Sequence, residues 1–463
     1  MQHAHEHRSL VLHHPPGFRA RRGLNWVSLG LLYASYYMCR YNFRFATPGM
    51  IAEFKFTQTQ ISDMLAIWSL AYGTGQLING LLSDRIGGRR SMLIGALGTI
   101  IVNLFFGFGS FAGTFMTFSL IWLINGYMQS FGAPGMVKIN AAWFHRTERG
   151  TFAGIFGFMI QLGQMSMSWL APLILAGFTI GTLVVAQGEW RWLFRIPPLF
   201  TVAAALLVYF VAKPSPDDAG YPGVIQDELD NSAGVTVSIA ESFKRIFTHP
   251  LVWFYAVAYA CTGAVRQSSD QIAVLYFQDQ LGFDMKKNIP HSASLTLALM
   301  PMVAVAGSLL SGWVSDKFFR GHRSPVAMFL YFLEAIVIAI AAFILLKGMV
   351  GPTPAGILLG CVILVMISFT ANSTHSIVGA AAPMDIGGKK MAGFAAGVID
   401  SFQYYGGALS LFITGRVLDA TKAQYGYTFW YVIMSVFGVI GGLTMLGVVL
   451  KQRRMSRVPY AST

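Results

Sequence analysis

The most restrictive feature of this chain is a series of apolar segments, each about as long as a membrane-spanning helix. A helix needs about 20 mostly apolar residues to cross the hydrocarbon core of a bilayer, and it must satisfy its backbone polar groups internally. Six such segments precede one long hydrophilic stretch, and six follow it. They lie near 24–47, 60–82, 91–110, 115–140, 151–178, 192–212, 251–277, 293–315, 324–347, 354–378, 391–418 and 426–450.

The composition agrees with twelve membrane helices rather than with a water-soluble fold. Apolar residues make up 54% of the chain and charged residues only 11%, whereas soluble domains carry about 25% charged residues. The sequence therefore predicts an all-α membrane protein whose surroundings are a lipid bilayer. The net charge of +13 is spread in short clusters between apolar segments. No basic stretch is interleaved with aromatic residues, so no nucleic-acid partner is expected.

The hydrophilic stretches divide the chain into five parts. Residues 1–23 are predicted to form a disordered cytoplasmic tail, because they lack the apolar core and cleavage site of a signal peptide. Six-helix bundles are predicted at 24–212 and 251–450, with a cytoplasmic loop at 213–250 between them and a cytoplasmic tail at 451–463. Five histidines belong to this predicted disordered tail, and no metal site is expected there: His3, His5, His7, His13 and His14.

Lysine and arginine residues predict the orientation, because they accumulate in the cytoplasmic loops of membrane proteins. The loops on the side of the two termini carry far more of them than the opposite loops. We therefore expect both termini in the cytoplasm and the spans in the inner membrane. The cytoplasmic group comprises Arg19, Arg21, Arg22, Arg85, Arg89, Arg90, Arg146, Arg149, Lys244, Arg245, Lys317, Arg320, Arg323, Lys389, Lys390, Lys451, Arg453, Arg454 and Arg457.

The two halves of the chain repeat one another. The loop after the second apolar segment reads Gly-Leu-Leu-Ser-Asp-Arg-Ile-Gly-Gly-Arg-Arg at 80–90, and the loop after the eighth reads Gly-Trp-Val-Ser-Asp-Lys-Phe-Phe-Arg-Gly-His-Arg at 312–323. Arg40 in the first segment and Arg266 in the seventh are separated by a similar distance along the chain. Parallel repeats of six helices are one known plan for secondary transporters.

The repeated loop resembles the signature loop of the major facilitator superfamily, Gly-x-x-x-Asp-Arg-x-Gly-x-Arg-Arg. The resemblance covers nearly the whole chain, and the loop stands in both places where that family has it. It implies the major facilitator fold, in which two pseudo-symmetric bundles of six helices surround a central cavity. That cavity opens alternately to either side of the membrane, and the protein of this fold usually works as a monomer.

Two arginines within the apolar segments are the strongest candidates for a binding site, since ionisable groups inside a membrane are costly and usually functional. Arg40 shares a helical stripe with Tyr33 and Tyr37, and this stripe is expected to face a wet cavity. Arg44 continues the stripe, but its position near the outer end favours an anchor to the lipid headgroups. Related by the repeat, Arg40 and Arg266 should meet across the cavity and bind a small anion through their fork-shaped guanidinium groups.

Three further motifs resemble the organophosphate:phosphate antiporter family, which includes glycerol-3-phosphate, hexose-phosphate and phosphoglycerate carriers. They are Tyr-Tyr-x-x-Arg-x-Asn-Phe around Arg40, Trp-Phe-x-x-x-Glu-Arg-Gly at 143–150 and Ser-Asp-Lys-x-Phe-x-Gly-x-Arg at 315–323. The resemblance implies that Arg40 and Arg266 are paired phosphate-binding arginines. The chain departs from the glycerol-phosphate type at Gln76, where that type has lysine, and at Ile160, where it has histidine.

Several other polar residues in the apolar segments have more than one interpretation. Asp270 could pair with Arg266 on the same helix face, either as a coupling group or as a structural ion pair. Asp400 could carry a coupling proton, pair with Arg416 or Lys138, or belong to an inner gate. Glu334 is expected to face bundle packing or lipid, and His375 either packs as a neutral ring or contacts substrate. The remaining substrate candidates are Gln76, Lys138, Gln161, Gln164, Tyr259 and Tyr404.

The charged residues of the repeated loops are predicted to act as gates rather than as substrate ligands. Their charge pairs would exist in one conformation only and would therefore bias alternating access. This group comprises Asp84, Arg85, Arg89, Arg90, Arg149, Asp316 and Arg323.

The sequence contains no pattern typical of an enzyme or a cofactor site. It has no phosphate-binding loop and no nucleophile elbow, and its three cysteines, Cys39, Cys261 and Cys361, are too widely spaced for a metal site or a disulfide framework. We expect a secondary transporter of a phosphorylated or phosphonate-type anion, with inorganic phosphate or protons as the coupling species. The alternatives are a proton-coupled carrier of a carboxylate or siderophore-like acid, and a transporter-like sensor of a sugar phosphate.

Overall fold

Twelve helical spans make up the computed structural model, which describes residues 14–109, 113–145, 149–225, 248–319, 322–385 and 392–455. The first six spans are α1 (Phe18–Phe54), α2 (Gln58–Ile86), α3 (Gly88–Phe108), α4 (Phe115–Gln129) with α5 (Gly132–Trp143), α6 (Arg149–Leu175), and α7 (Trp192–Arg195) with α8 (Pro197–Val211). The second six are α10 (Pro250–Asp279), α11 (His291–Phe318), α12 (Arg323–Leu346), α13 (Pro354–Asp385), α14 (Ala392–Tyr425) and α15 (Thr428–Met455). The predicted all-α membrane fold with twelve spans is confirmed.

The structure differs from the sequence-based segments in three places. The helix α1 is longer than the apolar run 24–47 and continues through Pro48. The fourth span is interrupted at Ser130–Phe131, where α4 ends and α5 begins. The connection between α6 and α7 contains a short antiparallel hairpin that was not predicted, formed by β1 (Phe178–Ile180) and β2 (Leu183–Val185). A single 3-10 turn, Asp217–Ala219, follows α8.

Several predictions fall on residues outside the described part of the chain. They are the histidines His3, His5, His7 and His13, the core of the central loop at 226–247, the basic residues Arg146, Arg320, Lys389 and Lys390, and the tail 456–463. For Arg149 the structure describes only the backbone, at the start of α6.

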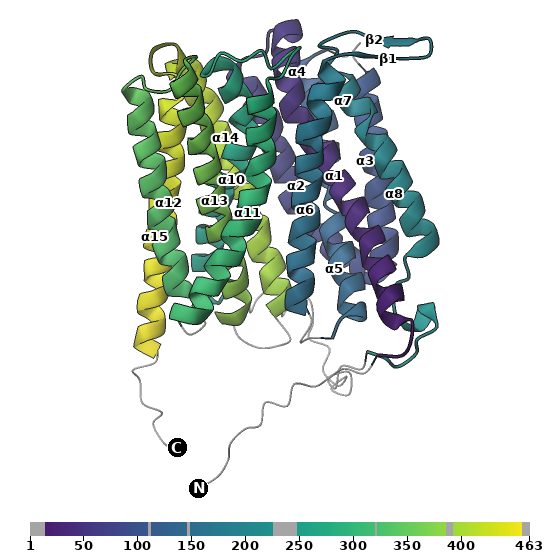
Figure 1. Ribbon diagram of the computed structural model, residues 1–463. Helices are drawn as coiled ribbons and strands as arrows, with labels where there is room; N and C mark the ends of the chain where they lie inside the picture. The colour runs from purple at the N-terminus through teal and green to yellow at the C-terminus, as the bar shows by residue number, and fades with distance from the viewer. Residues whose placement is uncertain are drawn as a thin grey trace.

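Both ends of the described chain lie at one face of the molecule, and the β hairpin lies at the opposite face (Figure 1). We call these the terminal face and the hairpin face. Each span runs between the two faces, and consecutive spans run in opposite directions (Figure 1). The N-terminal and C-terminal sets of helices lie side by side, and they meet where α2 packs on α14, α6 on α11 and α1 on α10.

Polarity distinguishes the spans at the interface between the halves from the others. In the described residues, seven spans pass a simple length-and-hydropathy test for crossing a membrane: α3, α6, α7 with α8, α11, α12, α13 and α15. The spans that do not pass include α1, α2, α10 and α14, which carry the charged and tyrosine-rich positions. Two of the three inter-half contacts named above, α2 with α14 and α1 with α10, are formed by these four helices. The polar groups are therefore turned toward the other half rather than toward lipid.

In each half, a glycine at a repeat-related position allows two helices to pack closely together. A Cβ at Gly163 of α6 would lie 2.2 Å from the carbonyl oxygen of Ala34 in α1. A Cβ at Gly406 of α14 would lie 1.9 Å from the carbonyl oxygen of Ala260 in α10. Ala34 and Ala260 are as far apart along the chain as Arg40 and Arg266. The repeat inferred from the sequence thus extends to the backbone packing that positions the two arginines.

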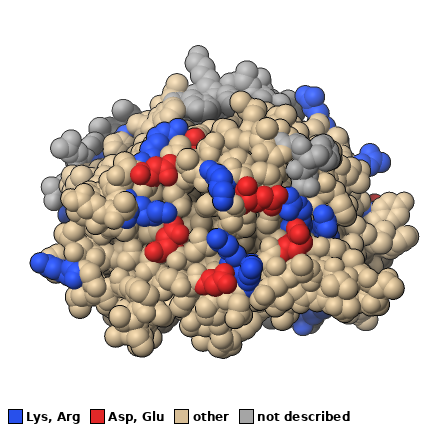
Figure 2. All heavy atoms as spheres, turned by 90° about the horizontal axis from the view of Figure 1, so that it is seen from above, with Lys and Arg blue, Asp and Glu red and all other residues tan. Residues whose placement is uncertain are grey.

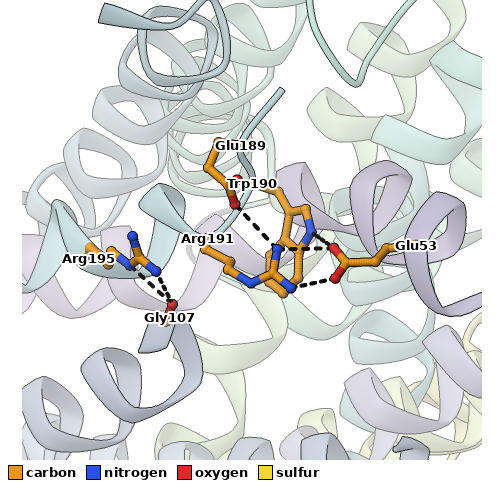
Figure 3. Close-up of polar contacts among 6 residues, drawn as sticks. All are labelled: Glu53, Gly107, Glu189, Trp190, Arg191 and Arg195. Atoms are coloured by element: carbon orange, nitrogen blue, oxygen red, sulfur yellow. Dashed lines mark hydrogen bonds and ion pairs between the residues drawn. The ribbon is translucent and has the colours of Figure 1, made fainter. Parts of the chain in front are cut away.

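At the hairpin face, a cluster of side chains ties the end of α1 to the segment before α7 (Figure 3). Arg191 donates to both carboxylate oxygens of Glu53, and the Trp190 indole donates to the same carboxylate at 2.9 Å. Arg195 donates to the carbonyl oxygen of Gly107 at the end of α3. These contacts hold the N-terminal half together at this face.

Candidate functional site

Arg40 lies inside the protein in a box of aromatic rings. Its guanidinium carbon is 4.3 Å from the ring centroid of Tyr37, 4.5 Å from that of Trp68 and 4.4 Å from that of Tyr72. Only 4% of the residue is exposed. The aromatic faces stabilise the cation and exclude water from it, so its charge is not dispersed by solvent. A cation held in this way attracts an anion strongly.

The hydrogen bonds of Arg40 leave one nitrogen of its guanidinium group without a hydrogen-bond partner. The Nε–H donates to Gln129 Oε1 at 3.1 Å, and Gln129 is held by the carbonyl oxygen of Cys39 and by Asn125. The buried Nη2 has no hydrogen-bond partner, and no acidic side chain in the described residues forms an ion pair with Arg40. Buried polar groups without partners are rare and call for an explanation, such as a ligand.

A polar ladder in the N-terminal half supports this arginine. Asn42 donates to Asn103 at 2.8 Å, Asn103 donates to Asn125 at 3.1 Å, and Asn125 is linked to Gln129. Sequence reasoning missed these residues, because each one stands alone in an otherwise apolar segment. The signal that could have found them is the unusual presence of four amide side chains in the first, third and fourth spans.

Arg266 is linked through an amide to a carboxylate. Its Nη1 donates to Gln403 Oε1 at 3.3 Å, and the amide nitrogen of Gln403 donates to the carboxylate of Asp400. Gln403 is the repeat counterpart of Ile160, because the two positions are as far apart as Gly163 and Gly406. The second half thus carries a polar group at the position where the first half has only an apolar one.

Tyrosines occupy the space between the two arginines. The Tyr37 side chain is within electrostatic range of both Arg40 and Arg266, and Tyr404 of α14 is near both as well. Tyr37 stacks on Tyr41 with ring centroids 5.9 Å apart, and Tyr33 contacts Tyr37 at 5.5 Å. The structure therefore brings together the predicted residues Arg40, Arg266, Tyr33, Tyr37 and Tyr404.

A cavity of about 730 Å³ opens between the halves below this cluster. Gln76, Tyr259 and Asp400 line its inner part, and Asp84 and Lys138, at the helix ends of the terminal face, line its mouth. The rest of the lining is mainly apolar: Leu77, Gly80, Leu81, Ala133, Pro134, Val137, Ala141, Gly379, Gly397, Val398 and Ile399.

The arginines do not line this cavity, which corrects the expectation that their stripe faces water. Tyr72 lies one helical turn from Gln76, and Tyr404 lies one turn from Asp400. The rings of Tyr72 and Tyr404 meet across the two halves with centroids 4.4 Å apart. This pair of rings, which we call the tyrosine bridge, contacts Arg40 through Tyr72 and lies one helical turn from the cavity-lining Gln76 and Asp400.

Arg44 and Asp270 occupy positions different from those predicted. Arg44 is fully buried rather than anchored to headgroups, and it donates to the backbone oxygen of Asp270 at 2.9 Å and to Ser168 at 3.1 Å. The carboxylate of Asp270 accepts from the Tyr41 hydroxyl at 3.1 Å and lies beside Gln164, instead of forming an ion pair with Arg266. These contacts cross from one half to the other, which is why both groups are buried.

Lys138 is separated from the arginine cluster. Its ammonium group contacts the carboxylate of Asp84 at 3.2 Å and the backbone oxygen of Ser83 at the mouth of the cavity. It therefore does not replace the missing cations near Arg40, and it does not pair with Asp400. Arg416 does not pair with Asp400 either, because it binds Asp63 near the hairpin face, at 2.7 Å.

The predicted gate residues whose side chains are described lie at the terminal face without ion pairs between the halves. Asp84 pairs only with Lys138 of its own half, and Arg89 donates to the backbone oxygen of Tyr209, also in its own half. Arg85, Arg90 and Asp316 are exposed, and Arg323 is half-buried. Among the residues with described side chains, no charge pair joins the halves at this face. Within the described residues, Asp84 and Lys138 at the mouth of the cavity pair only with each other.

The hairpin face, by contrast, is closed by polar contacts between the halves. The carboxylate of Asp419 in α14 accepts from the backbone N–H groups of Gln58 and Thr59 at the start of α2, at 3.0 and 2.9 Å. Arg416 and Asp63 join the same two helices. Asp279 contacts both Lys422 and the amide of Gln58. Acidic and basic groups alternate over this face in Figure 2.

The remaining predicted residues are accounted for as follows. Tyr259 hydrogen bonds to His375 at 3.3 Å, and the two rings stack with centroids 5.0 Å apart. Gln76 lines the cavity with a buried, unpartnered Oε1. Gln161 is half-buried on α6 and does not line the cavity. Glu334 faces bundle packing, as expected, and is fully buried.

Comparison with known proteins agrees with this geometry. The family model described as Major Facilitator Superfamily matches residues 29–411. The chain is 26% identical to the membrane sensor protein UhpC of Salmonella typhimurium, over 91% of this chain and 90% of that protein. It is 28% identical to a glycerol-3-phosphate transporter of Bacillus subtilis, over 87% of each chain.

Among solved structures, the chain is similar to a bacterial homolog of the human lysosomal transporter Spinster. The TM-score is 0.66 with 15% sequence identity, over 93% of this chain and 94% of that chain. This similarity supports the fold. The resemblance to organophosphate carriers inferred from the motifs is confirmed by the curated relatives.

Proposed function

Because the chain belongs to the Major Facilitator Superfamily, we propose that it is a secondary transporter of a small phosphorylated organic anion, bound between Arg40 and Arg266. One observation carries the proposal: a buried arginine from the first half, enclosed by three aromatic rings, has an unpartnered guanidinium nitrogen, and Tyr37 lies near both this arginine and an arginine from the second half. A dianionic phosphate monoester has the charge and the paired oxygens to satisfy such forks. The protein is not an enzyme.

The transport cycle follows from where the two halves touch. With the hairpin face closed and the terminal face open, the anion enters from the terminal face and displaces the tyrosine bridge. It then neutralises both arginines and pulls the halves together around it. Closing at the terminal face breaks the contacts at the hairpin face, and the site opens there. We infer that the terminal face is cytoplasmic in the inner membrane, that inorganic phosphate is the exchanged anion, and that one chain suffices.

Thermal unfolding of the purified protein with different anions tests the site directly. We expect inorganic phosphate and phosphate monoesters to raise the unfolding temperature, by about 2 °C or more at ten times the dissociation constant, and acetate to have no effect. Arg40→Lys keeps the charge but loses the fork, so it should weaken phosphate binding by about tenfold or more. Arg195→Lys, an equivalent change outside the site, should leave the phosphate effect intact. Equal phosphate effects in both variants would refute the site.

Phosphate exchange in proteoliposomes distinguishes transport from sensing. A sensor is the second candidate, because one of the closely similar relatives is a membrane sensor protein. Vesicles loaded with inorganic phosphate should take up radiolabelled phosphate if the chain is an exchanger, and Arg40→Lys should abolish this uptake. Phosphate binding without any exchange would instead favour the sensor.

A further inference from the structure

Glu334 is a buried carboxyl that the anion site does not use. It lies in the middle of α12, no part of it is exposed, and neither of its carboxylate oxygens has a hydrogen-bond partner. An ionised carboxylate without a partner in an apolar interior costs many kcal/mol, so such a group takes up a proton instead. In this conformation Glu334 is therefore a neutral carboxylic acid.

The groups around Glu334 come from four helices, and none of the described side chains that face it is basic. Cys261 faces it from α10, Thr374 faces it from α13, and Tyr331 lies one turn away on α12 itself. Thr374 donates its hydroxyl to Thr370 of its own helix. The neighbouring part of α15 presents Ser435, whose hydroxyl donates to the backbone of Ala335. Arg266, on α10, is directed to Gln403 instead.

Two ionisable side chains lie between the cavity and the part of α13 that faces Glu334. Tyr259 lines the cavity and hydrogen bonds to His375. The other ring nitrogen of His375, Nδ1, is buried without a partner. His375 follows Thr374, whose side chain is beside the Glu334 carboxyl. Tyr259 and His375 therefore place two ionisable groups between the cavity and the part of α13 whose Thr374 faces Glu334.

We propose that Glu334 is a proton-binding site that exchanges its proton with the cavity and thereby couples protonation to anion binding. Deprotonation would place a negative charge between α10, α12 and α13, the same half that supplies Arg266. This charge would oppose an anion at Arg266, so protonation of Glu334 favours anion binding. The predicted effect on anion binding rests on the proposed function, whereas the predicted protonation of Glu334 does not.

Infrared spectroscopy of the full-length protein tests the protonation independently of any ligand. At pH 7 the wild-type protein should show the carbonyl stretch of a neutral carboxylic acid in apolar surroundings, and Glu334→Gln should lack it. Cys261→Ser, a neighbouring change that leaves the carboxyl in place, should keep the band. A wild-type spectrum identical to that of Glu334→Gln would overturn the proposal.

The pH dependence of phosphate binding tests the coupling. Inorganic phosphate affinity is measured at pH 6 and pH 9 for wild type, Glu334→Gln and Glu334→Asp, and each comparison is made at equal pH so that the titration of phosphate cancels. Wild type and Glu334→Gln should agree at pH 6, and at pH 9 wild type should bind about fivefold more weakly or worse. Glu334→Asp, which keeps a carboxyl, should follow wild type.

Two results separate this inference from the proposed function. Failure of phosphate to bind any variant would refute the proposed function, while the infrared band would still decide whether Glu334 is protonated. Phosphate binding with the same pH dependence in wild type and Glu334→Gln would refute the coupling and leave the anion site standing. His375→Gln should preserve the difference between wild type and Glu334→Gln at equilibrium, since it alters the route and not the site.

Discussion

At the scale of single residues, the neighbours of Arg40 determine its position and its accessibility to water. Arg40 is held by three rings and one amide, so its position is fixed before any anion arrives. Such preorganisation lowers the entropy lost on binding. We expect the tyrosine bridge to control access, because Tyr72 packs on Arg40 and meets Tyr404 of the other half one turn from the cavity lining. Binding requires that these two rings separate.

Removal of one ring of the bridge should expose Arg40. In Tyr404→Ala the cavity would extend to the guanidinium, so phenylglyoxal, which reacts with accessible arginines, should modify Arg40 several times faster than in wild type. Peptide mass spectrometry measures this. The adjacent change Tyr405→Ala is the control, since Tyr405 contacts Thr74 at the helix surface and not the bridge. Unchanged modification of Arg40 in Tyr404→Ala would contradict the assigned barrier.

A second prediction at the residue scale concerns how stability depends on pH. It involves Glu53, which lies in α1 beyond the apolar run of that helix. Partial burial opposes ionisation of Glu53, but the bonds from Arg191 and Trp190 outweigh it and lower the pKa of its carboxyl (Figure 3). The stabilisation is therefore complete above the usual glutamate pKa of about 4.3 and is lost as pH falls through the lower folded value.

The unfolding temperature of Glu53→Gln should therefore lie below that of wild type at pH 7, and the gap should close as the pH approaches 3. The effect is modest, about 1 kcal/mol or less, because the pair is partly solvated. Asp218→Asn, at an exposed turn in the connection after α8, should show no comparable pH-dependent gap. A gap that persists unchanged at low pH would mean that packing, not charge, links these residues.

At the scale of helices, glycine contacts determine how closely the interface helices approach. Gly406→Ala places a methyl group 1.9 Å from the Ala260 oxygen, and Gly163→Ala places one 2.2 Å from the Ala34 oxygen. Backbone cannot yield as a flexible side chain can, so each change should destabilise by about 1–3 kcal/mol. Thermal unfolding measures this, with Gly312→Ala, which has no neighbour within 4 Å, as the control. Equal unfolding temperatures for all three variants would refute the close packing.

The helices were largely predictable from the sequence, whereas their pairing was not. Apolar length predicts spans, and the repeat of Asp84 as Asp316 predicts two equivalent halves. Three residues of the candidate site, Arg40, Arg266 and Tyr37, were identified from the sequence, because ionisable and aromatic residues stand out in apolar helices. The partners of Asp270, Lys138 and Arg416 were not, because all three depend on which helix lies opposite, and periodicity carries no such information.

At the scale of the whole molecule, the conformation depends on contacts that exist only while the hairpin face is closed. The carboxylate of Asp419 is the clearest of these, because it accepts from two backbone N–H groups at the N-terminus of α2 in the other half. A helix N-terminus carries a partial positive charge, and an anion placed there contributes about 0.3–1 kcal/mol. When the halves separate at this face, the contribution is lost. Asp419 therefore favours the conformation open at the terminal face.

Asp419→Ala should shift the population toward the conformation open at the hairpin face, by about two- to fivefold for a loss of this size. A cysteine introduced at Ala141, which lines the cavity, reports the shift: its labelling by a maleimide from the terminal face should slow. Thr57→Ala is the matched control. Thr57 caps the N-terminus of α2 through Gln60, and both residues belong to the first half. Loss of this cap should therefore lower stability without changing the labelling rate. If both variants slowed labelling equally, the conformational preference would arise from the stability of α2 and not from the contact between the halves.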